Sequence, residues 1–345
     1  MAEPTGLAAH AATVLQAHWW KSRPTLLMQA LRPLSWLYAA LAGLQRLRTS
    51  AQAAPVPVIV VGNLVVGGAG KTPTVIALVQ ELQAAGHRPG VVSRGYGRAS
   101  STLCEVTLDA SAGAVGDEPL LIHRRTGVPV WVGRDRLATA RALCARRPEV
   151  DVLVCDDGLQ HHALARVADL VVFDDRGVGN GMLLPAGPLR QPLPATLPAR
   201  TWVLYTGTQA STGLPGAMAT RTVGQVTPLA DWWRGQAQGT RPLAALRGQL
   251  VLAVAGLAAP EKFFSVLQAA GLTVQRLPQP DHANYDTLPW PAGQTRDILV
   301  TEKDAVKLRP GRPGTEHVGV VPLDFRLSAE LVRGLIDLLP RPPPP

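Results

Sequence analysis

VIVVGNLVVGGAGKTPT, residues 58–74, is the stretch that decides the fold of this chain. Its four leading apolar residues, 58–61, predict a buried strand of a parallel sheet. A glycine-rich turn follows, and from Lys71 onward the apolar residues recur at the spacing of one helix face. Pro73 falls in the first turn of that helix, where a missing N–H costs little. The order of strand, glycine loop, Gly-Lys-Thr and helix is typical of a phosphate-binding loop.

Such a loop holds a nucleotide through three kinds of group. Backbone N–H groups at the helix N-terminus surround phosphate oxygens, Lys71 reaches the outer phosphates, and the Thr72 hydroxyl ligates magnesium. The predicted nucleotide-binding residues are Gly67, Gly68, Ala69, Gly70, Lys71, Thr72 and Pro73. The usual spacing would place glycine at position 65, where this chain has Val65. The alternative is an ordinary glycine-rich turn, but the strand and helix on either side favour nucleotide binding.

Length and composition set the wider limits. A chain of 345 residues suggests two domains, and 46% hydrophobic residues with a mean hydropathy of +0.10 suffice for a core. The net charge of +9 favours anionic partners such as nucleic acid, anionic lipid or a phosphorylated substrate. Cys104, Cys144 and Cys155 lack metal-ligand spacing, which predicts a reducing compartment and neither a disulfide nor a zinc site.

Strand-like and helix-like segments alternate after the phosphate loop. Apolar runs occur at residues 90–93, 128–132, 152–155, 170–173 and 202–205. This alternation predicts an α/β fold with a P-loop NTPase-like, doubly wound parallel sheet. Residues 207–249 are predicted to form loops and a connecting segment. A second, smaller α/β domain is predicted from strand-like runs at 250–255, 298–300 and 318–321 and a helix at 260–270.

The N-terminal segment, residues 18–48, combines tryptophan, leucine and arginine. The first fifty residues predict no cleavable signal peptide, which would need a charged start, an apolar core and small residues at a cut site. They also predict no membrane span, because Arg32-Pro33 interrupts the only candidate. Trp19, Trp20 and Trp36 lie among leucines and basic residues, a composition typical of a helix in a lipid headgroup layer. A helix packed on its own domain is an equally good interpretation.

Several polar clusters follow predicted strand ends, where the ligand loops of a doubly wound sheet lie. Asp156 directly follows the run 152–155, and a P-loop protein holds its magnesium at such a strand end. Asp157 and Gln160 are close enough in the sequence to help. The alternative for Asp-Asp-Gly is a plain turn. Arg94, near Tyr96 and two glycines, has the planar fork that suits phosphate, although a solvated basic loop would look similar. Arg136 could grip an anionic substrate or form a surface pair.

Two further residues are candidates for proton transfer. Asp117 in Gly-Asp-Glu-Pro is either a helix N-cap or the group that orients an acceptor hydroxyl and accepts its proton. His282 beside Asp281 could transfer a proton or steady a phosphate, although a loop histidine is more often simply exposed. The run Thr-Glu-Lys-Asp at 301–304 does not support guanine specificity, because its lysine and aspartate are adjacent.

Taken in order, the motifs resemble the tetraacyldisaccharide 4'-kinase (lipid A 4'-kinase) family of Gram-negative bacteria. The resemblance runs from about residue 56 to residue 325 and rests on VGNL with GGAGKTP, SRGY, GDEP, DDGLQH, LPAGPLR, PDH and TEKD. Each motif is weak alone, whereas their shared order is specific. Val65 also fits, since the family lacks that glycine.

The resemblance implies a function. It implies ATP-dependent, Mg²⁺-assisted phosphorylation of the 4'-hydroxyl of a tetraacylated glucosamine disaccharide 1-phosphate, which forms lipid IVA. The implied partners are this lipid and the cytoplasmic face of the bacterial inner membrane, where the protein would be peripheral, with no nucleic acid. The implied organisation is an N-terminal membrane-interfacial helical segment (1–50), a P-loop kinase domain (51–215), and a linker with the smaller C-terminal α/β domain (216–345).

The resemblance also implies residue roles. Lys71 and Thr72 match the phosphate and magnesium ligands, and Asp156 and Asp157 match the acidic pair at the metal. Asp117 matches the proposed base, assisted by His282. The implied substrate-binding residues are Arg94, Tyr96, Arg136 and Gln160. One departure is Gln191 after Arg190, where the family commonly has glutamate.

Two other functions remain compatible with a phosphate loop. A nucleotide-switch ATPase that binds a protein or DNA partner would have a similar loop, and a basic surface would suit DNA. A kinase for a soluble small molecule would leave the first fifty residues unexplained.

Overall fold

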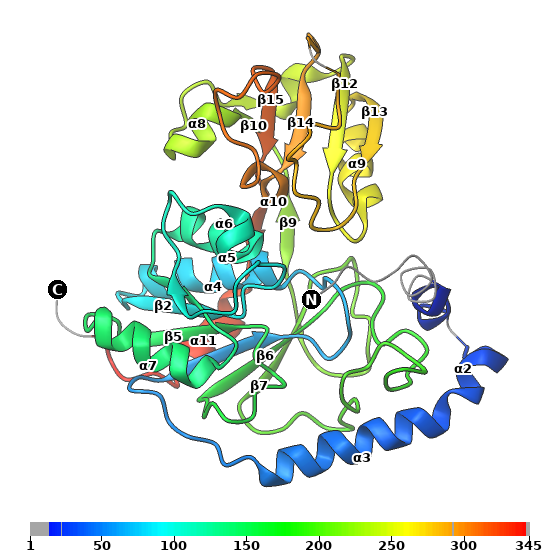
Figure 1. Ribbon diagram of the computed structural model, residues 1–345, viewed down its shortest axis with the longest axis vertical. Helices are drawn as coiled ribbons and strands as arrows, with labels where there is room; N and C mark the ends of the chain where they lie inside the picture. Colours follow the sequence, from blue (N-terminus) through cyan, green and yellow to red (C-terminus); the bar gives the residue numbers. More distant parts are fainter. Residues whose placement is uncertain (1–13, 22, 292, 343–345) are drawn as a thin grey trace.

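The computed structural model describes residues 14–21, 23–291 and 293–342 of the chain, which form two α/β domains and an N-terminal helical segment (Figure 1). The larger sheet contains β1 (Val58–Gly62), β2 (Pro89–Ser93), β3 (Cys104–Glu105), β4 (Val130–Val132), β5 (Val152–Asp156), β6 (Ala168–Phe173), β7 (Thr201–Tyr205) and β8 (Ala217–Met218). Their spatial order is β3-β4-β2-β5-β1-β6-β7-β8, and every neighbouring pair except β3 with β4 is parallel. The predicted doubly wound parallel sheet is confirmed.

Helices cover both faces of this sheet. They are α4 (Lys71–Ala84), α5 (Ala112–Val115), α6 (Asp117–Thr126) and α7 (Arg136–Arg146). Strand β1 shows why: Ile59 and Val61 pack in one core cluster with the buried residues of α4 and α6, whereas Val58 and Val60 pack in a second cluster with those of α7. A continuous apolar strand is therefore buried on both faces, as parallel sheets require.

The smaller domain has its own sheet. Its strands are β10 (Gln225–Pro228), β11 (Arg241–Pro242), β12 (Leu250–Ala255), β13 (Thr273–Pro278), β14 (Ile298–Thr301) and β15 (Val318–Val321), in the order β11-β10-β15-β14-β12-β13. Its helices are α8 (Leu229–Arg234), the 3-10 helix η1 (Leu243–Leu246), α9 (Pro260–Ala269) and α10 (Glu302–Ala305).

Residues 207–249, predicted as loops, thus contribute β10, β11 and α8 to this domain. Only the two middle residues of β10 are buried. That run is too short to show a strand period in the sequence.

The chain passes between the domains twice. Strands β9 (Thr220–Thr222) and β16 (Asp324–Arg326) pair antiparallel as a separate two-stranded ribbon, and β9 lies between the two bodies in Figure 1. The last helix, α11 (Ala329–Ile336), returns to the larger domain. There Gly334 approaches the Trp202 indole so closely that a Cβ would lie 3.1 Å from its Nε1. The C-terminal helix therefore follows the smaller domain in sequence but packs with the larger one.

The N-terminal segment runs along the larger domain as a helical stretch at residues 14–19, α2 (Leu26–Ala30) and α3 (Arg32–Arg48). Buried Ser35 donates to Leu183 O, and the Tyr38 hydroxyl donates to Arg190 O at 2.8 Å. The opposite side is apolar and exposed through Leu34, Trp36, Leu37, Leu41, Leu44 and Leu47. Among the residues that the structure describes, no helix combines the length and apolar character needed to cross a bilayer.

Candidate active site

The phosphate loop joins β1 to α4, with Gly67 and Gly70 at positive φ of 93° and 88°. Buried Asn63 ties the loop together: its Nδ2 donates to Gly67 O at 2.9 Å, and its Oδ1 accepts from Lys71 Nζ at 3.1 Å. Thr206, at the end of β7, donates to Ala69 O at 2.9 Å. The loop is therefore preformed, and its N–H groups open onto the N-terminus of α4.

The structure explains why position 65 can be valine where the usual phosphate-loop motif has glycine. Its side chain is fully buried, and its backbone forms an antiparallel bridge with Leu189. On either side, Val66 N donates to Pro188 O at 2.9 Å and Arg190 N donates to Leu64 O at 2.7 Å. The first half of the loop is thus extended and paired, and an extended residue does not need glycine.

The carboxylates at the end of β5 lie beside the loop, because Asp156 is in register with Val61 of β1. Asp156 is buried, and its Oδ2 accepts from Ser93 Oγ at 2.9 Å while its Oδ1 has no hydrogen-bond partner within the described residues. Burial, with Glu118 and Asp157 nearby, raises the pKa of Asp156. An orphaned buried carboxylate oxygen is what a magnesium ion would satisfy.

Asp157 is held differently. Its φ is 49°, and its carboxylate lies 3.0 Å from Arg190 Nη1 and 3.6 Å from Lys71 Nζ. Burial alone would raise the pKa of Asp157, but Lys71 and Arg190 outweigh it and the pKa is lowered. The described part of the chain has no group of three or more His, Cys, Asp or Glu side chains that could hold a metal. Magnesium would therefore depend on Asp156 and Thr72 together with phosphate and water.

Gln160 belongs to the same cluster. Its Nε2 donates to Asn63 O and to Gln191 Oε1, both at 3.3 Å, and its Oε1 accepts from Arg190 Nη1 at 3.2 Å. Gln191 therefore bonds to the amide of Gln160. Gln160 links the β5 carboxylates to the phosphate loop.

The smaller domain contacts Asp117 at the N-terminus of α6. Asp117 is 5% exposed, and its two oxygens lie 3.1 and 3.0 Å from His282 Nδ1. Lys303 and Lys307 of the smaller domain bring Nζ to 4.0 and 3.9 Å from Asp117 Oδ2. Burial acts to raise the pKa of Asp117, but His282, Lys303 and Lys307 outweigh it and the pKa is lowered. The hydrogen bond with Asp117 in turn raises the pKa of His282.

The candidate substrate residues occupy different surroundings. Tyr96 is 67% exposed, with its ring centroid 5.4 Å from that of His282, and Arg94 is exposed near it in the chain. Arg136 is buried, and its guanidinium donates to Arg134 O at 2.8 Å and to Asp157 O at 3.3 Å. In this conformation Arg136 supports the backbone beside the carboxylates.

Sequence reasoning missed Asn63, Thr206 and Lys307 and did not place Lys303 beside Asp117. Asn63 lay inside the loop motif, and Thr206 directly follows a predicted strand, so both carried a positional signal. In the sequence, Lys303 has no role beyond the rejected guanine pattern and the TEKD motif of the family resemblance. The structure instead places it 2.9 Å from Asp281 and 3.4 Å from Glu118.

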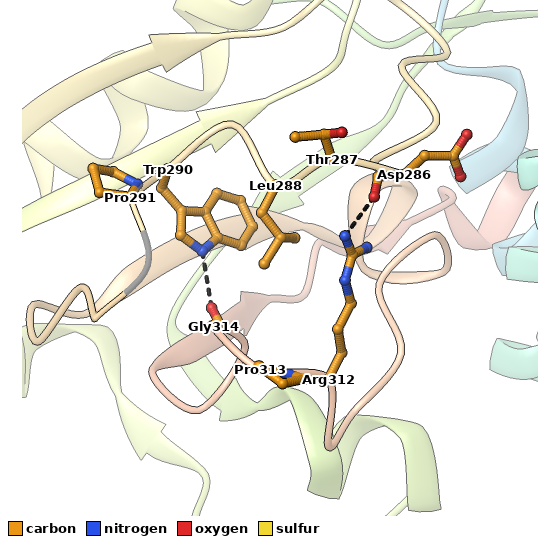
Figure 2. Close-up of a pocket in the computed structure, with 8 residues that line it drawn as sticks. All are labelled: Asp286, Thr287, Leu288, Trp290, Pro291, Arg312, Pro313 and Gly314. Carbon is orange, nitrogen blue, oxygen red and sulfur yellow. Dashed lines mark hydrogen bonds between the residues drawn. The ribbon is translucent and has the colours of Figure 1, made fainter.

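A separate pocket of about 330 Å³ lies in the smaller domain (Figure 2). Its lining residues are Asp286, Thr287, Leu288, Trp290, Pro291, Arg312, Pro313 and Gly314. Trp290 Nε1 donates to Gly314 O at 2.8 Å, and Arg312 donates to Asp286 O at 2.5 Å. These bonds tie two loops together, and no residue of the phosphate loop or the β5 carboxylates lines the pocket.

The preformed loop, its lysine and the carboxylates of the neighbouring strand define a P-loop nucleotide-binding enzyme. The family described as Tetraacyldisaccharide-1-P 4'-kinase (LpxK) matches residues 27–339, and the chain belongs to this family.

Individual relatives agree. The chain is 54% identical over 290 residues to a tetraacyldisaccharide 4'-kinase of Leptothrix cholodnii, covering 83% of each chain. It is 52% identical over 327 residues to one of Methylibium petroleiphilum, covering 90% of this chain and 91% of the relative. A crystal structure of LpxK from Aquifex aeolicus in complex with ATP is similar with a TM-score of 0.74 and 28% identity, over 91% of this chain and all of that one.

Family membership confirms the predicted class of enzyme. The chain is an ATP-using, magnesium-assisted kinase of lipid A biosynthesis, and the nucleotide-switch alternative is not favoured.

Proposed function

We propose that this chain transfers the γ-phosphate of ATP to the 4'-hydroxyl of a tetraacyldisaccharide 1-phosphate, forming lipid IVA. The observation that carries the proposal is the contact between Asp117, which belongs to the domain of the phosphate loop, and His282, which belongs to the smaller domain. A buried carboxylate held by a histidine is suited to an acceptor hydroxyl. The 4'-kinase relatives support the identity of the acceptor.

On the donor side, the chain supplies positioning and charge. Lys71 and the N–H groups of the loop bind the phosphates, while Thr72 and Asp156 would hold magnesium. When bound, magnesium neutralises charge on the outer phosphates. Asp157, paired with Lys71 and Arg190, keeps these cations in place. Catalysis then rests mainly on alignment and electrostatic stabilisation.

On the acceptor side, Asp117 is ionised because its pKa is lowered. A weakly basic carboxylate suffices when the transition state is loose and the hydroxyl proton leaves late. Asp117 thus orients the hydroxyl and accepts its proton, and His282 holds the carboxylate in place. Arg94, Tyr96, Arg136 and Gln160 are the proposed substrate-binding residues. Of these, exposed Tyr96 beside His282 is the best placed to contact a sugar ring.

A transfer assay with ATP and a tetraacyldisaccharide 1-phosphate, resolved by product mass, tests the proposal. Asp117→Asn and His282→Ala should each lower kcat by about 10²-fold or more, the usual contribution of acid–base groups. Exposed Asp109→Asn is the matched control and should leave the rate unchanged. A fully active Asp117→Asn enzyme would remove this residue from the mechanism.

We also propose that the protein is peripheral at the cytoplasmic face of the inner membrane, with residues 1–50 on the bilayer, 51–215 as the kinase domain and 216–345 as linker and smaller domain. The first thirteen residues lie outside those that the structure describes. The exposed apolar side of α3 and the basic net charge support this location.

Flotation with anionic vesicles tests the location. Trp36→Ser, Leu37→Ser and Leu41→Ser together should abolish flotation. Leu108→Ser with Leu250→Ser, exposed leucines outside this segment, should leave flotation intact. Equal flotation of both variants would contradict the proposed membrane face.

A further inference from the structure

A second cation reaches the phosphate loop from outside the P-loop motif. Arg176 follows β6, and its Nη2 donates to Gly68 O at 2.5 Å. A Cβ built on Gly67 would lie 3.7 Å from Arg176 Nη1. The guanidinium therefore lies against Gly67 and Gly68, the exposed turn of the loop.

Two neighbours fix this guanidinium. Buried Asp174 accepts from Arg176 Nε at 2.9 Å, and the Trp20 ring lies 4.3 Å from Arg176 Cζ. Lys262 of α9 in the smaller domain lies 3.8 Å from the same Asp174 carboxylate. Arg176 is thus braced by a carboxylate, by an aromatic face of the N-terminal segment, and indirectly by the smaller domain.

These contacts leave one edge of the guanidinium available. Nε and Nη2 are engaged, whereas Nη1 donates no hydrogen bond to any residue that the structure describes. The side chain is 26% exposed. An arginine that is rigid, planar and partly unpaired at a phosphate loop is suited to donating to phosphate oxygens.

We propose that Arg176 is a further catalytic residue of the phosphate site: its Nη1 donates to an outer phosphate of the bound nucleotide and stabilises the charge of the transferring phosphoryl group. Arg176 exchanges no proton. The bond between phosphorus and the ADP oxygen breaks, the bond to the acceptor oxygen forms, and the hydroxyl proton passes to Asp117. An arginine supplied within the same chain is an established way to stabilise this kind of transition state.

The proposal rests on the proposed function, because it assigns Arg176 to the same phosphate site. A purely structural latch on Gly68 is the competing role. The two roles differ in what the loss of Arg176 would weaken. Loss of a latch would weaken the binding of the ground-state nucleotide as well, whereas loss of a catalytic arginine would weaken mainly the binding of the transition state.

Calorimetry separates these roles without turnover. The probes are Mg-ADP and Mg-ADP with aluminium fluoride, which imitates the transferring phosphoryl group. Arg176→Ala should leave the affinity for Mg-ADP within about threefold and weaken the aluminium fluoride complex by about 10² or more. Its kcat should fall by about 10³, with the KM for ATP nearly unchanged. Arg176→Lys should restore less than a tenth of kcat, because lysine lacks the planar fork.

Arg276→Ala, which removes an exposed arginine of the smaller domain, is the control and should change neither affinity. Equal weakening of both complexes by Arg176→Ala, or full rescue by Arg176→Lys, would overturn the proposal in favour of a latch.

The Trp20 contact gives a second test. Trp20→Ala should lower kcat by about threefold to tenfold through a less ordered Arg176, while Trp20→Phe, which keeps an aromatic face, should retain it. In Arg176→Ala the Trp20 substitution should have no further effect. Independent, multiplying losses would show that Trp20 acts elsewhere and would overturn its assigned role.

Failure of this inference and failure of the proposed function are distinguishable. If Lys71→Ala loses both nucleotide complexes while Arg176→Ala loses neither, the phosphate site stands and Arg176 is excluded from it. If wild-type enzyme does not phosphorylate the disaccharide while its aluminium fluoride complex still depends on Arg176, the acceptor is wrong and the role of Arg176 stands.

Discussion

The larger domain supplies the candidate site with a phosphate loop and buried carboxylates, whereas the smaller domain supplies His282, Lys303 and Lys307. Lys71 at the start of α4 pairs with Asp157, which follows β5, and Asp156 at the end of β5 lies next to them; all three belong to the larger domain. Asp117 also comes from the larger domain, but its charge is balanced from the other side. The difference suggests that nucleotide binding belongs to one domain, while acceptor chemistry needs both.

Helix α6 shows how the two domains are joined. Its first residue is Asp117, and at its other end Arg125 Nη1 lies 2.6 Å from both oxygens of Glu302 in the smaller domain. Glu302 also accepts from Trp232 Nε1, and Arg124 lies 4.0 Å from the Trp233 ring. Helix α6, which carries the Asp117 carboxylate, is therefore anchored to the smaller domain at both ends.

The largest expected effect comes from a substitution in the phosphate loop, which affects the larger domain's nucleotide site alone. Lys71→Ala should lower kcat/KM by about 10³, because it removes a preorganised charge from the phosphates. Arg276→Ala, at an exposed cation of the smaller domain, is the control. Steady-state transfer kinetics measure the change. A loss of less than tenfold would show that the larger domain's loop is not the donor site.

The next effect breaks the joint between the domains. Arg125→Ala should lower the free energy of unfolding by about 3 kcal/mol, since it leaves Glu302, 8% exposed, without its charged partner. Arg276→Ala breaks an exposed Arg–Glu pair of similar length and should cost less than about 1 kcal/mol. Urea titrations of both variants compare them. Equal costs would mean that the α6 anchor is no stronger than a surface pair.

A smaller effect depends on pH. Because the folded-state pKa of His282 is raised, its pairing with Asp117 contributes stability that is complete below the unfolded pKa of about 6.5 and is lost as pH rises through the folded pKa. The free energy of unfolding of the wild type should exceed that of His282→Gln by about 1 to 2 kcal/mol at acidic pH, and this difference should shrink in alkaline solution. Thermal unfolding across this range measures it. A difference that grows with pH would contradict the assigned pair.

The smallest effect concerns Gln191, where the family commonly has glutamate. Gln191 accepts from Gln160, and a glutamate could accept the same bond. Gln191→Glu should therefore change kcat by about threefold or less, as most substitutions of partly exposed residues do. Parallel assays of both enzymes decide the matter. A tenfold gain would show that the glutamate has a role that this chain lacks.

Local sequence patterns predicted the central strands of the sheets better than an edge strand. The runs at 58–61 and 152–155 appear as β1 and β5 because a continuous apolar run followed by a glycine-containing turn is a strong signal. Strand β13 went unpredicted, because its residues Thr273–Pro278 are only partly buried and alternate weakly. Strands at an edge lack the pattern that burial imposes.

The site divides in the same way. The phosphate loop was predictable because its residues are contiguous in the sequence, and Asp156 was predictable because it follows a buried apolar run at the sheet edge where such a loop lies. The contact of Asp117 with His282 joins residues 165 apart, and only a family resemblance paired them in advance. Arg176 lies in Asp-Asp-Arg-Gly, which reads as a turn, and its approach to Gly68 spans 108 residues. No local pattern contains such a contact.

The pairing of Val65 with Leu189 has a consequence for the entropy of nucleotide binding. Flexible glycine loops lose conformational freedom when a ligand orders them, and that loss weakens the ligand's affinity. Here the first half of the loop is already ordered by the bonds of Val66 to Pro188 and of Arg190 to Leu64, so its ordering is part of folding. The turn at Gly67 and Gly68 is held by two side chains, because Gly67 O accepts from Asn63 and Gly68 O accepts from Arg176. The affinity for ATP should thus depend on segment 183–190, which lies far from the P-loop motif in the sequence.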